Sequence, residues 1–369
     1  MRIIKNAFLL TLFIISNLGL SAQEQWGKYA HLFTVPNTYT AGYSSHTIKI
    51  DGQANEQDWK DAAWTSEFAD IQGVNMPQPT YPTRIKMLWD DTNLYIFAEL
   101  TEENIWAYYD KQDMIVYHEN DFEVFIDPDG DIHNYYEFEV NARNTLFDLF
   151  LDKPYRNGGK PDIEWNAEGF KSAVYLDGTL NDPTDTDKKW CVEMAIPFAS
   201  LTTDGNFIQP EAGAIWKINF SRVQWQTEII EGKYTRKTND DGKLLPEDNW
   251  VWSPQGVINM HYPERWGLIQ FSSESPKAAQ GTFKLPEEEL LARHLWHLFY
   301  AQRDYRNETK TYCSNLASLG ITIEGKENDT NFSLEMNASG NTYTATLKTN
   351  NGLMISINQD GLIQKHTDN

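Results

Sequence analysis

The sequence predicts an all-β protein, a jelly-roll-like antiparallel β-sandwich followed by a small α+β unit. Three observations carry this prediction. Apolar and polar residues alternate in short segments between residues 47 and 271, and turn-forming residues separate these segments. No segment between them has the length of the crossover helices that parallel strands require. After residue 286, a long amphipathic stretch is followed by further short alternating segments.

The alternating segments are the strands expected in the sandwich. A short helix is also expected at "NEQDWKDAAW", where Asn55 can cap the first turn and Trp59 and Ala63 share one face. The expected strands, in chain order, are "TIKIDG", "TRIKMLWDD", "NLYIFAEL", "DFEVFIDPDG", "YYEFEVN", "TLFDLFL", "KSAVYLDG", "WCVEMAIP", "IWKINFSRVQW" and "WGLIQFS".

The composition changes after residue 272. Residues 273–285 are small, polar and interrupted by prolines, which is typical of a linker. Residues 286–369 begin with a helix whose acidic first turn suits the positive end of the helix dipole, and three alternating segments then predict a small β-meander. The helix directs one stripe toward a core, made of Leu291, Leu295, Leu298, Gln302 and Tyr305.

The first residues predict export. Arg2 and Lys5 precede the apolar run "AFLLTLFII", and small residues allow cleavage after Ala22. We therefore expect a signal peptide over residues 1–22, an N-terminal extension over residues 23–45, and a periplasmic or secreted protein. A transmembrane anchor is not expected, because the apolar run is shorter than the roughly 20 residues that cross a bilayer.

Charge and composition narrow the range of partners. The net charge of −22 argues against nucleic acid, because phosphates would be repelled. Aromatic residues make up 13% of the chain, and Trp and Tyr rings can stack on sugars, so an oligo- or polysaccharide is the favoured partner. Two distant cysteines, Cys191 and Cys313, cannot form a disulfide framework. One disulfide between them is compatible with the sequence, but two single buried thiols are the favoured expectation. The oligomeric state stays open.

Acidic residues gather on one face of two neighbouring strands. In "DFEVFID", alternation turns Phe122 and its apolar partners inward, so Glu123 lies on the opposite face. The next strand, "YYEFEVN", turns Tyr135, Glu137, Glu139 and Asn141 to that same face. Like charges on paired strands repel each other. This cluster is either a wet sheet face or a site compensated by Arg143, a metal or a ligand.

The turn "DPDGD" raises the question of calcium. Asp127, Asp129 and Asp131 alternate as the first ligands of a calcium loop do. Gly130 stands two positions early for that motif, and Phe138 occupies the position of its bidentate acid. Bound calcium and an ordinary hairpin turn rich in turn-forming residues are both compatible with the sequence.

The quoted segments, together with "IDGQANEQDWKDAAW", "ENDFEVFIDPDG" and "ERWGLIQF", resemble the family 9 carbohydrate-binding modules. The closest likeness is to the family 9-like proteins that bacteria export, and it covers residues 46–272. The resemblance implies a calcium-associated β-sandwich. It also implies a site that holds a sugar between two aromatic rings, above a Glu, an Arg and an Asn.

The resemblance assigns roles to particular positions. Glu123 matches the Glu that contacts the sugar, and Asn141 matches the Asn. The first ring falls at Tyr117 and the second within Met260–Tyr262, while Glu139 stands where the family has Arg. The candidate ligand-binding residues are Glu123, Glu139, Asn141, Tyr117, Arg143, His261, Tyr262 and Trp252.

The favoured function is a non-catalytic, exported protein that binds a glycan on a concave sheet face. One alternative is a glycoside hydrolase-type enzyme that uses Glu123 and a second carboxylate such as Glu139. Another is a structural or partner-docking protein of the cell envelope. Met260 and His261 also resemble the axial ligands of related haem-binding sandwiches, although no second axial partner accompanies them. Neither a zinc-protease motif nor a nucleophile elbow occurs in the sequence.

Overall fold

The structure is a computed structural model that describes residues 25–73, 75–203, 206–281 and 283–366. The expected signal peptide lies outside these residues. The chain divides into two compact units. The larger unit is Pro36–Lys284, and the smaller one combines residues 25–35 with the chain from Leu285 onward.

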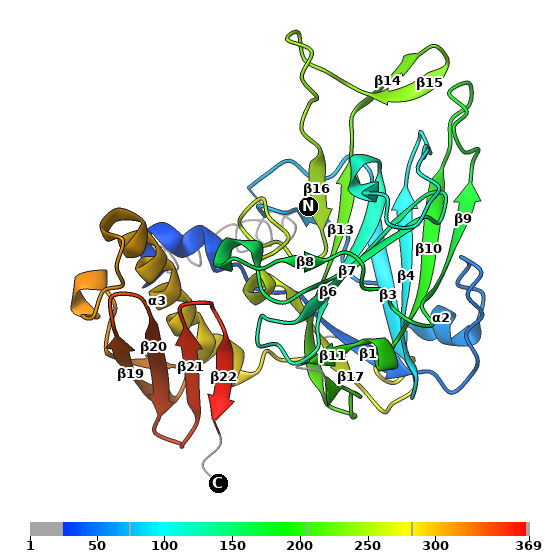
Figure 1. Ribbon diagram of the computed structural model, residues 1–369. Coiled ribbons are helices and arrows are strands. Elements are labelled where there is room, and N and C mark those ends of the chain that lie inside the picture. The colour runs from blue at the N-terminus through cyan, green and yellow to red at the C-terminus, as the bar shows by residue number, and fades with distance from the viewer. Residues whose placement is uncertain (1–24, 74, 204–205, 282, 367–369) are drawn as a thin grey trace, which may run out of the picture. The chain divides into compact units, whose positions relative to one another are not determined.

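The larger unit consists almost entirely of strands (Figure 1). Its single α-helix among the described residues is α2 (Gln57–Asp61). This helix starts after Glu56, so Asn55 is not its cap, and no side chain caps it. The strands are β1 (Thr38–Tyr43), β2 (Ala69–Asp70), β3 (Thr83–Trp89), β4 (Asn93–Thr101), β5 (Asp121–Asp127), β6 (Tyr135–Asn141), β7 (Leu146–Leu151), β8 (Pro161–Asp162), β9 (Lys171–Asp177), β10 (Lys189–Pro197), β11 (Thr202–Thr203), β12 (Asn206–Phe207), β13 (Ile215–Gln224), β14 (Thr227–Ile230), β15 (Lys233–Arg236), β16 (Asp248–Val251) and β17 (Gly267–Phe271).

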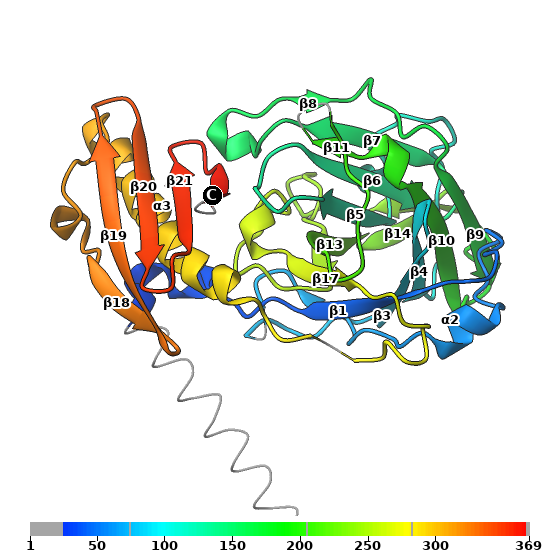
Figure 2. The same cartoon turned by 90° about the horizontal axis from the view of Figure 1, so that it is seen from below.

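Hydrogen bonds join most of these strands into one continuous path, in the order β8-β7-β6-β5-β13-β17-β1-β3-β4-β10-β9. The path curls back on itself, so that β4 and β10 face β5 and β6 across the core (Figure 2). This confirms the predicted sandwich, and every neighbouring pair along the path except those made by β1 is antiparallel.

Strand β1 joins the two halves of the sandwich. Its residues Thr38–Ala41 pair in parallel with β17, and Gly42 and Tyr43 pair in parallel with β3. Alternation did not predict this strand, which lies in the expected N-terminal extension, because its partners are distant in sequence. Gly42 also allows a close approach: a Cβ there would lie 2.5 Å from the Cα of Pro276.

The core lies between the two halves and is built from the predicted inward positions. Phe122, Val124 and Ile126 of β5 are fully buried there, beside Ile96 and Ala98 of β4. Burial of each large apolar side chain contributes about 1.5–3 kcal/mol to folding. The opposite face of β5 is thereby directed away from this core, as period-two alternation requires.

The smaller unit packs one helix, α3 (Glu287–Thr309), on a five-stranded antiparallel sheet. The predicted stripe on α3 is confirmed for its first four residues, since Leu291, Leu295, Leu298 and Gln302 are all fully buried, whereas Tyr305 is only half-buried. The meander has two outer strands more than predicted, because their polar sequences carry no apolar alternation. The sheet consists of β18 (Glu324–Glu327), β19 (Thr330–Ala338), β20 (Tyr343–Thr349), β21 (Met354–Asn358) and β22 (Ile363–His366).

The segment before residue 36 is held within the smaller unit. Trp26 is buried, its ring stacks on Phe33 with centroids 4.2 Å apart, and it contacts His294 and His297 of α3. Cys191 and Cys313 are both free, buried thiols, as predicted. Among the described helices, none has the length and apolar character needed to span a bilayer.

Candidate functional site

The acidic sheet face forms as the alternation predicts. Strands β5 and β6 pair antiparallel, and Glu123 lies directly opposite Glu139 in this register. Glu123 is also opposite Ser221 of β13, on its other side. The side chains of alternate residues along both strands therefore point to one surface, away from the main core.

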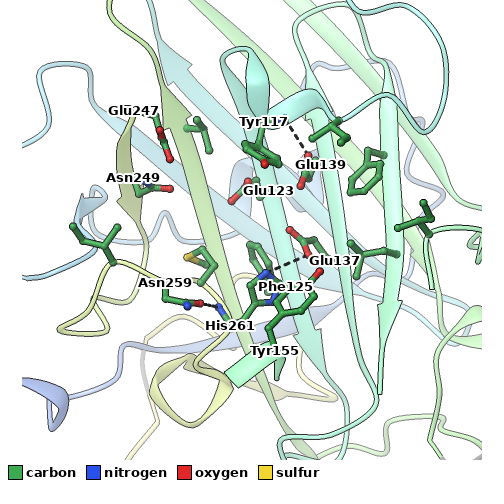
Figure 3. A pocket seen from close by; sticks show the side chains of 17 residues that line it. Tyr117, Glu123, Phe125, Glu137, Glu139, Tyr155, Glu247, Asn249, Asn259 and His261 are labelled. Carbon is green, nitrogen blue, oxygen red and sulfur yellow. Dashed lines mark hydrogen bonds and ion pairs between the residues drawn. The ribbon is translucent and has the colours of Figure 1, made fainter. Parts of the chain in front are cut away.

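A pocket of about 550 Å³ opens over this surface (Figure 3). Its size falls in the usual range for small-ligand sites, about 300–1,000 Å³. Strands β5 and β6 provide its acidic floor, and segments far away in sequence provide its walls. The lining residues are Ile115, Tyr117, Glu123, Phe125, Glu137, Glu139, Phe147, Leu149, Tyr155, Ile163, Val223, Glu247, Asn249, Ile258, Asn259, Met260 and His261.

Three glutamates of the floor are held close together at low exposure. Glu123 and Glu137 are each 5% exposed and Glu139 is 2% exposed. Burial raises the pKa of Glu123 to about 7, and burial together with the charge of Glu123 raises the pKa of Glu137 to about 8. Burial and the neighbouring carboxylates also raise the pKa of Glu139 well above its usual value. The carboxyl groups of the floor therefore stay partly protonated near neutral pH, unless a bound positive group takes the place of these protons.

His261 faces these carboxyl groups without carrying a positive charge. Its Nδ1 lies 2.9 Å from the Tyr135 hydroxyl, and its Nε2 lies 3.9 Å from a Glu137 oxygen. Burial, and then the charge of Arg156, lowers the pKa of His261 to about 3. At neutral pH the imidazole is consequently neutral and does not compensate the carboxyl groups.

Aromatic rings border the pocket. Tyr117 and Tyr155 are 40% and 42% exposed, so each presents a ring surface to the solvent side of the pocket. The ring of Tyr155 also packs edge-on against His261, with centroids 4.5 Å apart. Tyr117 is tied to the floor, because its backbone N–H donates a hydrogen bond to Glu139 Oε2 at 3.1 Å. The pocket thus combines flat apolar walls with a polar floor.

Comparison with known proteins finds a family model that matches part of this sandwich. Residues 50–209 match the model of the carbohydrate family 9 binding domain-like family. The sandwich is family 9 carbohydrate-binding module-like. This confirms the resemblance drawn from the sequence.

Curated relatives share only this part of the chain. An endo-1,4-beta-xylanase A of Thermoanaerobacterium saccharolyticum is 30% identical over 162 residues, which are 44% of this chain and 12% of the xylanase. The exoglucanase XynX of Acetivibrio thermocellus is 32% identical over 117 residues, or 32% of this chain and 9% of that enzyme. The family 9-like chain thus spans about a tenth of these relatives.

Solved structures with a similar fold include carbohydrate-binding proteins. A family 9 module from Caldicellulosiruptor kristjanssonii in complex with cellotriose aligns with a TM-score of 0.40 at 16% identity, covering 67% of this chain and 99% of the module. A putative carbohydrate-binding protein from Bacteroides uniformis aligns with a TM-score of 0.48 at 16% identity, covering 64% of this chain and all of that one (100%).

Four of the eight predicted ligand-binding residues line the pocket of the family 9-like domain. They are Glu123, Glu139, Tyr117 and His261. Tyr262 follows His261 but lies outside the lining, and the guanidinium of Arg156 stacks 4.0 Å from the centroid of its ring. Trp252 is 2% exposed and packs in the main core against Phe220, so the pocket does not reach it.

Asn141 and Arg143 also lie outside the pocket lining. The Asn141 amide donates to Tyr109 O and to Glu119 Oε2, at 3.0 and 3.1 Å. Its carbonyl oxygen accepts from the backbone N–H groups of Arg143 and Thr145, both at 3.0 Å. These four bonds fix the β6–β7 turn and use the full capacity of the amide. The side chain of Arg143 is exposed.

Sequence reasoning missed part of the lining. Asn249 lies in the short strand β16 and Asn259 in the loop that follows it, where no alternation indicates which way a side chain points. Tyr155 lies in the 3-10 helix Tyr155–Asn157, and its aromatic character was the available signal for a role as a wall. Glu247 lies just before β16 and also lines the pocket. Alternation did place Glu137 on the correct face, and this was the available signal for its role.

The acidic turn after β5, which we name the turn cluster (Asp127, Asp129 and Asp131), is held by backbone hydrogen bonds. Buried Asp127 accepts from Gly130 N at 2.9 Å and from Ile132 N at 3.0 Å. Asp129 accepts from Asp131 N, and Asp131 accepts from His133 N. The three side chains each offer an oxygen within 4.8 Å of the others. Hydrogen bonding within the hairpin accounts for their arrangement without an ion.

Proposed function

We propose that this family 9-like protein binds a carbohydrate in the pocket over β5 and β6, without cleaving it. The observation that carries the proposal is the pocket itself. Two partly exposed tyrosine rings, Tyr117 and Tyr155, stand beside a floor of carboxyl groups, and the amides of Asn249 and Asn259 also line the pocket. Aromatic rings stack on the apolar faces of sugars, and carboxylate and amide oxygens accept hydrogen bonds from sugar hydroxyl groups.

The proposal rests on the match to the carbohydrate family 9 binding domain-like model, which covers the strands of the pocket floor. The pocket differs from the pattern implied by the family in at least two respects. Glu139 stands where an Arg is expected, beside Glu123, and Asn141 lies outside the pocket lining. A ligand for this floor therefore faces several acidic groups.

Isothermal titration with a panel of neutral and amino oligosaccharides tests the proposal. We expect saturable binding that is lost in Glu123→Ala, with an unchanged circular dichroism spectrum and melting temperature. Glu211→Ala is the matched control, because Glu211 is an exposed carboxylate outside the pocket. The absence of binding to the entire panel would refute the proposal.

The same panel tests the enzymatic alternative. Glu123 and Glu139 lie opposite each other on β5 and β6, and each offers an oxygen within 4.8 Å of the other. Retaining glycosidases also hold two carboxyl groups close together, about 5–5.5 Å apart, so hydrolysis is tested directly. Release of reducing sugar that stops in Glu123→Gln would replace the binding function with hydrolysis. We expect no release.

We also propose that the protein is exported, on the basis of Arg2, Lys5 and the apolar run that follows them. Fractionation of producing cells, with N-terminal sequencing of the mature protein, tests this. We expect a new N-terminus at residue 23 in the periplasm or medium. A full-length chain in the cytoplasm would contradict it.

A further inference from the structure

Three carboxyl groups meet beneath the pocket, and we name them the strand cluster: Asp121, Glu123 and Glu139. One oxygen of each lies within 4.8 Å of the others. Asp121 and Glu123 are alternate residues of β5 and so share a face, and Glu139 is paired with Glu123 across the β5–β6 ladder. Their exposed fractions are 0%, 5% and 2%, respectively.

Asp121 stands out within the strand cluster. It is fully buried, yet neither of its carboxylate oxygens accepts a well-formed hydrogen bond. A buried carboxyl group without partners costs several kcal/mol, and native proteins avoid this unless another group supplies the missing contacts. This observation is independent of the proximity of the three acids, and it indicates a ligand that the oxygens of Asp121 are arranged to hold.

The surrounding side chains do not provide that ligand. Among the described residues that line the pocket, none is Lys or Arg. His261 also lines the pocket, but its Nδ1 is hydrogen-bonded to the Tyr135 hydroxyl and its Nε2 faces Glu137, which is not part of the strand cluster. Arg143 is exposed. Burial raises the pKa of Glu119, and the charge of Arg143 opposes this rise, but Glu119 lies outside the strand cluster.

We propose that the strand cluster binds a divalent cation of the calcium type at the floor of the pocket. All three side chains offer oxygen, which is the donor that calcium prefers, and no His or Cys ligand accompanies them. Calcium–oxygen distances of about 2.3–2.6 Å place two ligand oxygens of one ion at most about 5 Å apart. The observed limit of 4.8 Å is compatible with a single ion.

The position of the cation links it to the carbohydrate. Glu123 and Glu139 belong both to the strand cluster and to the pocket lining, whereas Asp121 lies behind them. Three carboxylates leave calcium with open coordination positions, since it takes six to eight oxygens. We infer that hydroxyl groups of the sugar fill some of these positions. This second step rests on the proposed carbohydrate function, whereas the cation site does not.

Calcium titration of the chelator-treated full chain tests the site. We expect one saturable calcium site, and at least about a tenfold loss of affinity in Asp121→Asn and in Glu139→Gln, because each removes a charged ligand. Glu211→Gln is the matched control. Melting curves in chelator establish that each variant folds, and the two variants keep the test usable if one does not.

Two results would overturn the cation site. One is the absence of saturable calcium binding to the folded wild-type protein. The other is wild-type affinity in both strand-cluster variants, together with a loss in Asp129→Asn, which would assign the ion to the turn cluster. Magnesium in place of calcium should bind more weakly, because it demands regular octahedral geometry.

Carbohydrate titration with and without calcium separates the two steps. We expect sugar binding to weaken at least about tenfold in chelator and to recover when calcium is restored. Sugar binding that is unaffected by chelator would overturn the bridging role and leave the proposed function intact. Calcium binding without binding of any sugar would instead refute the proposed function and leave the cation site intact.

Discussion

The strand cluster and the turn cluster are both groups of three acidic residues that include residues of β5, yet their buried carboxyl groups differ in hydrogen bonding. In the turn cluster, Asp127 accepts two backbone N–H groups at 2.9 and 3.0 Å. In the strand cluster, Asp121 is equally buried and accepts no well-formed hydrogen bond. The acidic residues that are close in sequence stabilise the hairpin by hydrogen bonds. Those that the β5–β6 pairing brings together keep oxygens that can bind a ligand.

The largest expected effect comes from the turn cluster. Asp127→Ala should destabilise the protein by about 3 kcal/mol, because it leaves the buried donors Gly130 N and Ile132 N unpaired. Chemical denaturation measures the change, and calcium should not reverse it. A loss below about 0.5 kcal/mol would show that the hydrogen bonds of this turn do not stabilise the fold.

In the strand cluster, loss of an acidic side chain should raise the free energy of unfolding instead of lowering it. In chelator, Asp121→Asn should stabilise the protein by about 1–2 kcal/mol, because a neutral amide replaces an unpartnered buried carboxyl group and can donate to its neighbours. Denaturation in chelator and in calcium measures both states, and the gain should vanish in calcium. Destabilisation in chelator would contradict the contrast between the clusters.

The pH dependence of stability tests whether His261 is neutral, and therefore whether it can compensate the strand cluster. Its pKa is lowered from 6.5 to about 3 in the folded protein, so the unfolded chain takes up a proton first as the pH falls. The contribution of His261 to stability is therefore present above pH 6.5 and is lost as the pH falls from there toward 3. His261→Gln should remove this component.

The difference in stability between wild type and His261→Gln, measured by denaturation from pH 7 to pH 4, checks this prediction. The difference isolates His261 from the carboxyl groups of the pocket, which titrate in the same range. A difference that does not change with pH would mean that the pKa of His261 is the same in the folded and the unfolded chain. A difference of the opposite sign, in which His261 adds stability as the pH falls, would mean that the folded state holds the imidazole charged, as a partner for the carboxyl groups of the pocket.

The smallest effect is expected at the tip of the hairpin. Asp129 is exposed and accepts one backbone hydrogen bond, from Asp131 N at 3.2 Å. Asp129→Asn should change stability by less than about 0.5 kcal/mol, because an exposed Asn supports the same turn. Equal melting temperatures for wild type and variant are the expected readout. A shift that depends on calcium would indicate an ion at the turn.

Much of the floor of the pocket could be predicted from the sequence. Alternation placed Phe122 in the core and Glu123 on the opposite face, and the short β5–β6 connection brought Glu139 beside it. The roles of Asn141 and Trp252 could not be predicted from alternation. Both were expected to bind the ligand, but the Asn141 side chain stabilises the β6–β7 turn and the Trp252 side chain packs in the core.

The sequence by itself determined nine of the ten strands expected in the sandwich, their inward and outward faces, the amphipathic helix α3 and the acidic character of one sheet surface. These follow from local periodicity, which each segment carries independently of its partners. The segment "TIKIDG" was wrongly expected to be a strand, because residues 47–52 alternate but pair with no neighbouring strand. Only the tertiary structure decided that β1 joins the two halves in parallel, that Tyr155 packs against His261 at the pocket, and that Asp121 accepts no well-formed hydrogen bond. These features depend on contacts between distant segments, and local periodicity does not encode which distant segments meet.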